Sequence, residues 1–337
     1  MKKRFLFCAL ACALGFTLLG FAGCDGGETP PDDGKHTHTY VDGICECGKY
    51  EADFISMLPM APNLQAACDE AGTVVDFSYE TRAYALEALD DSDAEIPMTK
   101  TVQVYLPYGY DASKQYNILY LQHGAGETYT YWLTDMGATT RNVLDNMIKD
   151  GKCEPVIVVA PTVYSQAEGY EELWDSADWT GNFPQEFRND IVPAVEQEYS
   201  TYAGGDVSEE NLIASRDHRA FAGFSMGSVT SIEIMKNCAD MLSYVGSYSA
   251  GSDGAAVSEA LHSDAFNGYD IKYWFNQNGT ADFALSSQQE MVAYVRESMT
   301  DKFQEGKNFA YIEIPGGSHA YNCWIIGLYN SMLVFYK

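Results

Sequence analysis

Residues 221–235 read FAGFSMGSVTSIEIM and place Ser225 between two glycines, after a short apolar run and before a helical pattern. The glycines Gly223 and Gly227 fit two interpretations. They can relieve crowding where a buried strand turns into a helix, with Ser225 as the helix cap. They can also form the pattern G-x-S-x-G, a nucleophile elbow in which a strained turn exposes the serine hydroxyl. The pattern is short, so its partners must be found elsewhere in the chain.

The chain around this stretch alternates strand-like and helix-like segments. Runs rich in Val, Ile, Leu, Tyr and Phe indicate strands buried on both faces. These runs lie at 101–107, 117–123, 155–161, 219–224, 243–250, 271–278 and 309–315. A helix with a kink at Pro193 is predicted over 184–202, and another begins at a capping box of Ser286 and Gln289. The alternation predicts one α/β domain over residues 73–337, with a mostly parallel sheet covered by helices on both faces.

Residues 1–23 are predicted to be a targeting segment. A positive start at residues 2–4 precedes an apolar run over 5–19, and the sequence then reads Phe-Ala-Gly before Cys24. This ending resembles a bacterial lipoprotein signal, in which the cysteine is lipidated and becomes the mature N-terminus. An uncleaved membrane anchor is the alternative, because the apolar run is only slightly short of a membrane span. Both interpretations place the rest of the chain outside the cytoplasm.

Residues 24–72 are predicted to be a tether and a short spacer. Residues 25–35 are Gly, Pro and acidic residues without periodicity. Four candidate zinc ligands follow within a short span: His36, His38, Cys45 and Cys47. Their C-x-C spacing lacks the C-x2-C turn of common zinc sites, which favours a surface spacer over a metal-binding knuckle.

The chain is strongly acidic, with 20 Lys and Arg against 48 Asp and Glu and a formal net charge of −28. Such a surface repels phosphate, which excludes nucleic acid as a partner and limits membrane contact to the N-terminal lipid anchor. Several cysteines remain after residue 23 and an oxidising exterior would allow disulfides, but their spacing does not define a pairing.

A serine nucleophile needs a histidine base, and the base needs an acid that orients it. Only two histidines follow Ser225, namely His262 and His319. His262 lies in a segment predicted to be at the surface, whereas His319 comes just after the last strand on a Gly-Gly turn. Asp282 lies on the loop after strand 271–278, where a capping role is the alternative. Ser225, Asp282 and His319 are the predicted triad.

The backbone N–H groups of Met226 and Ala125 are predicted to form the oxyanion hole. Met226 follows the nucleophile and opens a helix, whose N-terminal dipole favours negative charge. Ala125 lies in the turn His-Gly-Ala-Gly that ends strand 117–123. His123, the first residue of that turn, is predicted to shape the loop by hydrogen bonding.

Six stretches occur in order over roughly residues 73–337: VYLPYGYD, ILYLQHGAGE, DIVPAVEQEYSTYA, HRAFAGFSMGS, NGTAD and GGSHAYNCW. Together they resemble the feruloyl esterase and acetyl xylan esterase branch of the esterase D-like α/β-hydrolases. The resemblance implies an α/β-hydrolase fold and a serine carbohydrate esterase without cofactor or metal, with the triad at the positions above. Tyr321 stands where members often carry tryptophan, and Ser228 where a glycine is common, which leaves the acyl specificity open.

From this resemblance we expect an enzyme that removes feruloyl or acetyl groups from plant cell-wall polysaccharide through an acyl-enzyme. Four aromatic residues in or beside the motif loops are candidates for a wall around a phenolic acyl group, with core packing as the alternative: Trp132, Trp179, Tyr321 and Trp324. Two other functions remain open. One is acyl transfer to a sugar, as in the mycolyltransferases of this fold, and the other is an inactive surface-anchored carbohydrate-binding protein, which a complete triad disfavours.

Overall fold

The computed structural model describes residues 40–41, 44–45, 60, 62–90 and 94–337. The predicted targeting segment, Cys24 and the candidate metal ligands His36, His38 and Cys47 lie outside these residues. In the described part of the chain no helix is long and apolar enough to span a membrane. The same part contains no group of three or more His, Cys, Asp or Glu that could hold a metal ion.

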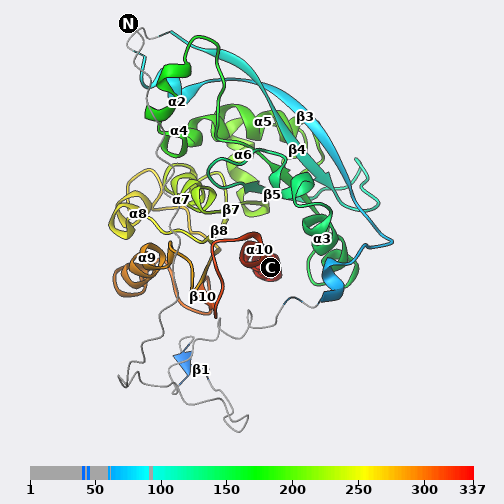
Figure 1. The fold of residues 1–337 in the computed structure, drawn as a ribbon, viewed down its shortest axis with the longest axis vertical. Coiled ribbons are helices and arrows are strands. Elements are labelled where there is room, and N and C mark those ends of the chain that lie inside the picture. The colour runs from blue at the N-terminus through cyan, green and yellow to red at the C-terminus, as the bar shows by residue number, and fades with distance from the viewer. Residues whose placement is uncertain (1–39, 42–43, 46–59, 61, 91–93) are drawn as a thin grey trace, which may run out of the picture. The chain divides into compact units, whose positions relative to one another are not determined.

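Eight strands form one sheet in the order β10-β9-β8-β7-β5-β6-β4-β3 (Figure 1). β3 pairs antiparallel with β4 and β4 with β6, and every other pair is parallel. The strands are β3 (Thr73–Arg82), β4 (Pro97–Leu106), β5 (Asn117–Gln122), β6 (Val156–Ala160), β7 (Arg219–Phe224), β8 (Tyr244–Tyr248), β9 (Tyr273–Gly279) and β10 (Phe309–Ile314). A separate antiparallel pair joins β1 (Tyr40–Val41) and β2 (Ile44–Cys45). The mostly parallel sheet is therefore confirmed, and seven of its strands coincide with the predicted runs.

Helices cover both faces of the sheet, as predicted. The α-helices are α2 (Tyr84–Glu87), α3 (Thr139–Lys149), α4 (Trp179–Glu186), α5 (Val192–Glu198), α6 (Glu209–Ala214), α7 (Met226–Cys238), α8 (Gly254–Leu261), α9 (Leu285–Ser298) and α10 (Tyr321–Val334). Shorter turns of other helical types are η1 (Pro62–Gln65), η2 (Tyr131–Asp135), η3 (Glu171–Ser176), η4 (Phe187–Ile191) and η5 (Arg216–His218).

Strand β7 shows how the two faces are divided. Side chains of a strand alternate between faces, so Phe221 packs into the core under α4, α7 and α9. Its neighbours Ala222 and Phe224 point the other way, into the core under α3 and α10. All three side chains are at most 1% exposed. A strand buried on both faces has to be apolar throughout, which is why these runs are easily recognised in the sequence.

Two helix predictions differ from the structure in detail. The helix expected over 184–202 is divided into α4, the π-helical turn η4 and α5, and Pro193 lies in the first turn of α5, directly after η4. The capping box at Ser286 is wrong, because α9 begins at Leu285 and its N-cap is Ala284. The N–H of Ala284 donates instead to Oδ1 of Asp282, at 2.8 Å.

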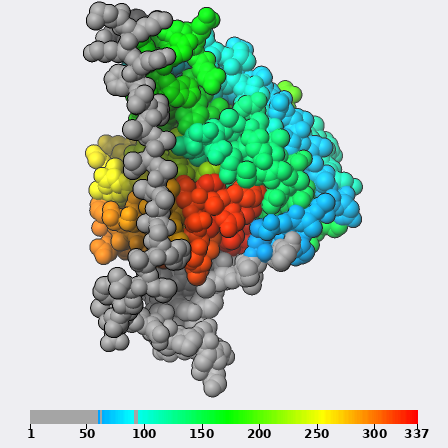
Figure 2. All heavy atoms as spheres, in the orientation of Figure 1, coloured from blue at the N-terminus to red at the C-terminus, as the bar shows by residue number. Residues whose placement is uncertain are grey.

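The last part of the predicted spacer packs on the catalytic domain. Leu64 of η1 is fully buried, and Nδ2 of Asn146 in α3 donates to its carbonyl at 3.0 Å. Leu64 shares a core cluster with Leu328 of α10. In Figure 2 the blue surface of the N-terminal described residues accordingly borders the red surface near the C-terminus. Among the described cysteines, Cys68, Cys153, Cys238 and Cys323 are free thiols.

Candidate active site

Ser225 lies at the sharp turn between β7 and α7. Its φ of 54° and ψ of −121° are a conformation that non-glycine residues rarely adopt. A Cβ on Gly223 would come within 2.6 Å of the Gly227 carbonyl oxygen, and one on Gly227 within 2.6 Å of the His123 oxygen. Both glycines are therefore needed for close backbone approach. Ser225 makes no side-chain cap hydrogen bond, so the helix-cap interpretation is wrong and the elbow interpretation fits.

In the predicted triad, His319 lies between Ser225 and Asp282, within hydrogen-bonding distance of each. The Ser225 hydroxyl is 2.9 Å from Nε2 of His319. Nδ1 of the same ring is 2.9 Å and 3.0 Å from the two carboxylate oxygens of Asp282. A carboxylate can only accept, so Nδ1 carries the hydrogen and Nε2 is left to accept from the serine. The Asp282 side chain is fully buried, whereas 18% of the His319 side chain is exposed.

The alternative histidine lies in another part of the molecule. His262 follows α8, and its Nε2 is 2.8 Å from the Asp301 carboxylate. This exposed ion pair raises the pKa of His262, chiefly through the hydrogen bond with Asp301. No contact joins it to Ser225, which agrees with the choice of His319 as the base.

The sheet topology places all three triad residues at the carboxyl ends of parallel strands. In the sheet, β5 lies between β6 and β7. The chain therefore passes from β5 to its neighbour β6 and then crosses to β7, the neighbour of β5 on the opposite side. Such a change of direction opens a crevice at the carboxyl ends of the two central strands, the usual ligand position in open α/β sheets. Ser225 follows β7 there, and the turn with Ala125 follows β5. Asp282 and His319 follow β9 and β10.

The predicted oxyanion donors lie on two segments that meet beside Ser225. Among the described residues, neither the Met226 N–H nor the Ala125 N–H donates to another protein group. Two unpaired donors at a helix start and a turn suit a developing negative charge. A Cβ on Gly124 would come within 2.4 Å of the Phe224 ring, which explains the glycine before Ala125.

His123 holds this turn, as predicted. Its Nδ1 lies 2.7 Å from the Gly124 carbonyl, which can only accept, so Nδ1 carries the hydrogen. Its Nε2 then accepts from the Thr162 hydroxyl at 2.8 Å. Burial lowers the pKa of His123 to about 4. The ring is therefore neutral near pH 7 and acts as a fixed link between the turn and the end of β6.

Tyr164 contacts both segments of the predicted oxyanion hole, which was not predicted from the sequence. Its hydroxyl accepts the Gly126 N–H at 3.0 Å and lies 3.5 Å from Sδ of Met226. Its ring packs on His123, with centroids 5.7 Å apart. A tyrosine four residues after the end of β6 gives no sequence signal for these contacts, because they depend on how the loop after β6 folds back.

The four candidate aromatic residues do not form a single wall. Trp132 is 1% exposed and donates Nε1–H to the Gln122 carbonyl, so it belongs to the core. Trp324 stacks on Phe224 with centroids 3.8 Å apart and meets the His319 ring edge-on at 5.1 Å. Trp324 therefore packs against the His319 ring and limits its movement. The prediction that Trp132 lines an acyl pocket is therefore wrong, because its ring is enclosed by packing.

Tyr321 and Trp179 occupy different clusters. The Tyr321 hydroxyl is 2.8 Å from Oγ1 of Thr140, and burial raises its pKa to about 12. Trp179 begins α4 and packs on Trp174 and Tyr164, with centroids 4.6 Å and 5.6 Å away. This second cluster lies against the oxyanion turn through Tyr164.

Phe283 is the second residue that the sequence analysis missed. It follows Asp282 on the loop after β9, its side chain is 80% exposed, and its ring lies 4.2 Å from that of His319. Its exposed ring is therefore an apolar surface directly beside the imidazole of the triad. The only sequence signal is its position beside the predicted acid.

A strained serine after a central parallel strand, with histidine and carboxylate in line behind it, defines a serine hydrolase of the α/β class. Comparison with known proteins agrees with this class. The chain belongs to the Esterase family, whose model matches residues 94–330. It is a serine ester hydrolase, and its resemblance to feruloyl esterases is confirmed.

Two relatives are xylan-degrading enzymes. Endo-1,4-beta-xylanase Y of Acetivibrio thermocellus is 33% identical over 285 residues, which cover 80% of this chain and 24% of that enzyme. Endo-1,4-beta-xylanase/feruloyl esterase of Xylanibacter ruminicola is 30% identical over 158 residues, or 45% of this chain and 20% of that enzyme. The chain therefore spans a quarter or less of the length of these relatives.

Two solved structures share the fold over most of their length. An alanine-for-serine mutant of the feruloyl esterase module from Clostridium thermocellum, complexed with sinapinate, is 29% identical, with a TM-score of 0.69 over 83% of this chain and 93% of that one. A CE1 ferulic acid esterase from Anaeromyces mucronatus in complex with ferulic acid is 20% identical, with a TM-score of 0.63 over 82% and 95%. At 20% identity, the likeness to the Anaeromyces mucronatus enzyme shows a shared fold only.

Proposed function

We propose that this esterase removes hydroxycinnamoyl groups, such as ferulate, from the xylan of plant cell walls. The main support is the exposed ring of Phe283, whose centroid lies 4.2 Å from that of the His319 imidazole. A flat apolar surface at the reacting serine favours an aromatic acyl group over an acetyl group, which has little area to bury. The names of the xylanase and feruloyl esterase relatives support the same substrate class.

Acylation begins at Ser225. His319 accepts the hydroxyl proton through Nε2 while the serine oxygen attacks the ester carbonyl carbon. The carbonyl oxygen becomes an oxyanion and accepts hydrogen bonds from the N–H groups of Met226 and Ala125. Asp282 holds the Nδ1–H tautomer and stabilises the imidazolium. His319 then gives its proton to the leaving sugar hydroxyl, and the acyl group remains on the serine.

Deacylation uses the same groups in reverse. A water molecule gives a proton to Nε2 of His319 and attacks the acyl carbon. The second tetrahedral intermediate collapses when the proton returns to the Ser225 oxygen. The products are the free carboxylic acid, the restored serine and the sugar hydroxyl released earlier. The 18% exposure of the His319 side chain leaves its ring accessible to water.

We also propose that the enzyme works outside the cytoplasm, attached to a membrane through lipidated Cys24. The support is the sequence of the targeting segment, in which a positive start and an apolar run precede Phe-Ala-Gly-Cys. The acidic residues 25–35 would then connect the anchor to the catalytic domain.

The deciding experiment measures ferulate and acetate released from the same arabinoxylan preparation. We expect ferulate from the wild-type enzyme and neither acid from the Ser225→Ala variant. Release of acetate without ferulate would contradict the aromatic specificity while leaving the mechanism intact. A Ser225→Ala variant with full activity would contradict the mechanism itself.

A further inference from the structure

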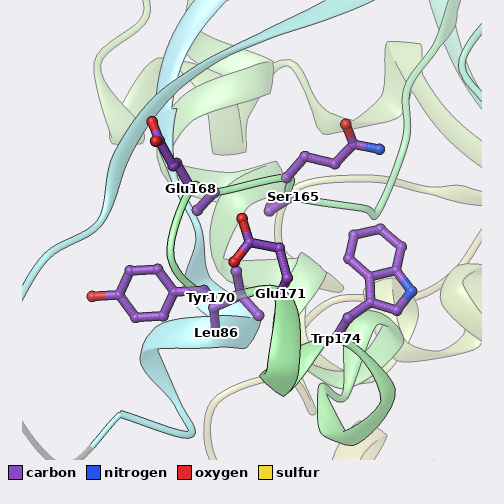
Figure 3. Close-up of a pocket in the computed structure, with 8 residues that line it drawn as sticks. Leu86, Ser165, Glu168, Tyr170, Glu171 and Trp174 are labelled. Atoms are coloured by element: carbon purple, nitrogen blue, oxygen red, sulfur yellow. The ribbon is translucent and has the colours of Figure 1, made fainter. Parts of the chain in front are cut away.

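A cavity lies next to the aromatic cluster of Tyr164, Trp174 and Trp179, which contacts the oxyanion turn. Its volume is about 370 Å³, within the range of small-molecule sites. It is lined by residues of the loop after β6, by η3 and by α2 (Figure 3), among them Leu86, Ser165, Glu168, Tyr170, Glu171 and Trp174. The described residues that line it do not include Ser225, so it is separate from the reacting centre.

Ser165 marks this cavity as a place for a polar ligand. The residue is only 2% exposed, and its hydroxyl makes no hydrogen bond to any described residue. The hydroxyl oxygen is open to the cavity, so a ligand that displaces water there can replace the hydrogen bond that the water makes. The side chain lines the cavity, so a bound group can reach it.

The cavity is linked to the active site through two rings. Trp174 forms part of its wall and packs on Tyr164, with ring centroids 5.1 Å apart. The Tyr164 hydroxyl in turn contacts Gly126 and the Met226 side chain, both beside the oxyanion hole. The cavity wall and the oxyanion turn are therefore joined by the packed rings of Trp174 and Tyr164.

The lining combines flat apolar surfaces with hydrogen-bond acceptors. In Figure 3 the carboxylate of Glu171 lies between the rings of Tyr170 and Trp174. Aromatic rings pack against the C–H faces of a sugar, and carboxylates accept strong hydrogen bonds from its hydroxyl groups. Glu168 and Glu171 both line the cavity and would repel a second negative charge. This chemistry suits an uncharged sugar and disfavours a uronate.

We propose that this cavity binds an uncharged sugar residue of the glycan whose ester is cleaved at Ser225. The proposal rests on the proposed function for the identity of the glycan. Binding of the carbohydrate part here would hold the ester in the crevice, so that carbohydrate-linked esters are better substrates than simple ones.

The first test measures binding without turnover. Xylotriose, which carries no ester, is titrated calorimetrically into the full chain carrying Ser225→Ala. Added to that background, Glu171→Ala should weaken binding by about tenfold, the scale of one hydrogen bond to a charged group, and Ser165→Ala by about fivefold, since its hydroxyl is neutral. Glu172→Ala is the matched control, because Glu172 is the next residue of η3 and does not line the cavity. It should bind like the parent.

The second test compares two esters. The ratio of kcat/KM for a feruloylated arabinoxylo-oligosaccharide to kcat/KM for methyl ferulate should fall about tenfold in Glu171→Ala and stay constant in Glu172→Ala. No xylotriose binding, equal binding by the two glutamate variants, or equal binding of trigalacturonate would overturn the proposal. An enzyme that binds xylotriose as expected and releases no ferulate would contradict the proposed function alone.

Discussion

The hydroxyl of Tyr164 accepts the N–H of Gly126 at 3.0 Å and lies 3.5 Å from Sδ of Met226. Gly126 closes the turn that carries the Ala125 amide, and Met226 provides the other amide of the oxyanion hole. One phenol therefore links the two segments whose relative position sets the hole. Since oxyanion stabilisation depends on donors fixed in advance, a small displacement of either segment should slow the reaction.

Tyr164→Phe should lower kcat by roughly fivefold to tenfold with little change in KM, because the lost hydroxyl acts on the transition state. The ring keeps its packing on His123 and Trp174. Steady-state kinetics on methyl ferulate measures the effect. Tyr110→Phe is a matched control. That phenol also accepts a backbone N–H, from Ser200 at 2.9 Å, but it makes no contact with the triad. Equal losses of kcat in the two variants would rule out a specific role for Tyr164.

The triad predicts a graded pattern of losses. His319→Ala should cost nearly as much as Ser225→Ala, because an unactivated serine is a poor nucleophile. Asp282→Asn should lower turnover by on the order of 10⁴, since an amide can favour the wrong imidazole tautomer. His262→Ala is the control for the histidine and should keep normal turnover, as its exposed pair with Asp301 lies elsewhere. A double variant no worse than either single one would show that the residues act as a unit.

Asp270 provides the control for the acid. It precedes β9, and its carboxylate is 3.7 Å from the Lys302 ammonium. Asp270→Asn should leave kcat unchanged. If this variant lost activity while Asp282→Asn kept it, the assignment of the orienting acid would be wrong.

The sheet and the triad were predictable because their signals are local. Strands buried on both faces must be apolar, as Phe221 and Ala222 show, and the order of serine, acid and histidine follows from their strands. Strand β3 was missed because it is a half-exposed edge strand with polar residues along it. The start of α9 was misplaced because Asp282, outside the helix, bonds to the N–H of Ala284.

The surroundings of the triad could not be predicted in the same way. Whether Trp132 is enclosed or exposed depends on the packing of η2 against Phe224, which no short pattern encodes. The exposure of Phe283 depends on the path of the loop after β9. Tyr164 acquires its role only when the loop after β6 meets the turn after β5. Such contacts join residues far apart in the chain.

Phe283 should contribute to the choice of acyl group. Phe283→Ala should lower kcat/KM for methyl ferulate by about tenfold and alter that for p-nitrophenyl acetate much less, since a short acyl group buries little area on the ring. Stability should be unchanged, because the side chain is 80% exposed. Tyr108→Ala, which removes another exposed ring at 58% exposure, should affect neither substrate. An equal fall for both esters would show that Phe283 positions His319 without selecting the acyl group.

The proposed anchor is tested by Cys24→Ser. The variant should leave the membrane fraction while keeping the kcat of the catalytic domain, because lipidation requires the cysteine thiol. Fractionation followed by an esterase assay measures both properties. Membrane association that persists in the variant would indicate an uncleaved apolar helix in place of a lipid.

Burial of His123 should make the enzyme sensitive to mild acid. Its pKa is lowered from 6.5 to about 4, chiefly by desolvation, so the unfolded chain binds a proton on this residue at pH values where the native state does not. The stabilisation is therefore present above pH 6.5 and is lost as the pH falls towards 4. Between pH 7 and pH 5 the linkage removes about 2 kcal/mol of unfolding free energy.

Urea unfolding at pH 7 and pH 5 measures this loss, and His123→Gln should reduce it, because glutamine does not titrate. His262→Gln is the control. The pKa of His262 is raised by Asp301, so its stabilisation has the opposite sign, present at low pH and lost as the pH rises. The His262→Gln variant should therefore still lose the unfolding free energy that His123 contributes between pH 7 and pH 5. If wild type and His123→Gln lost the same free energy between pH 7 and pH 5, the acid sensitivity would have another origin.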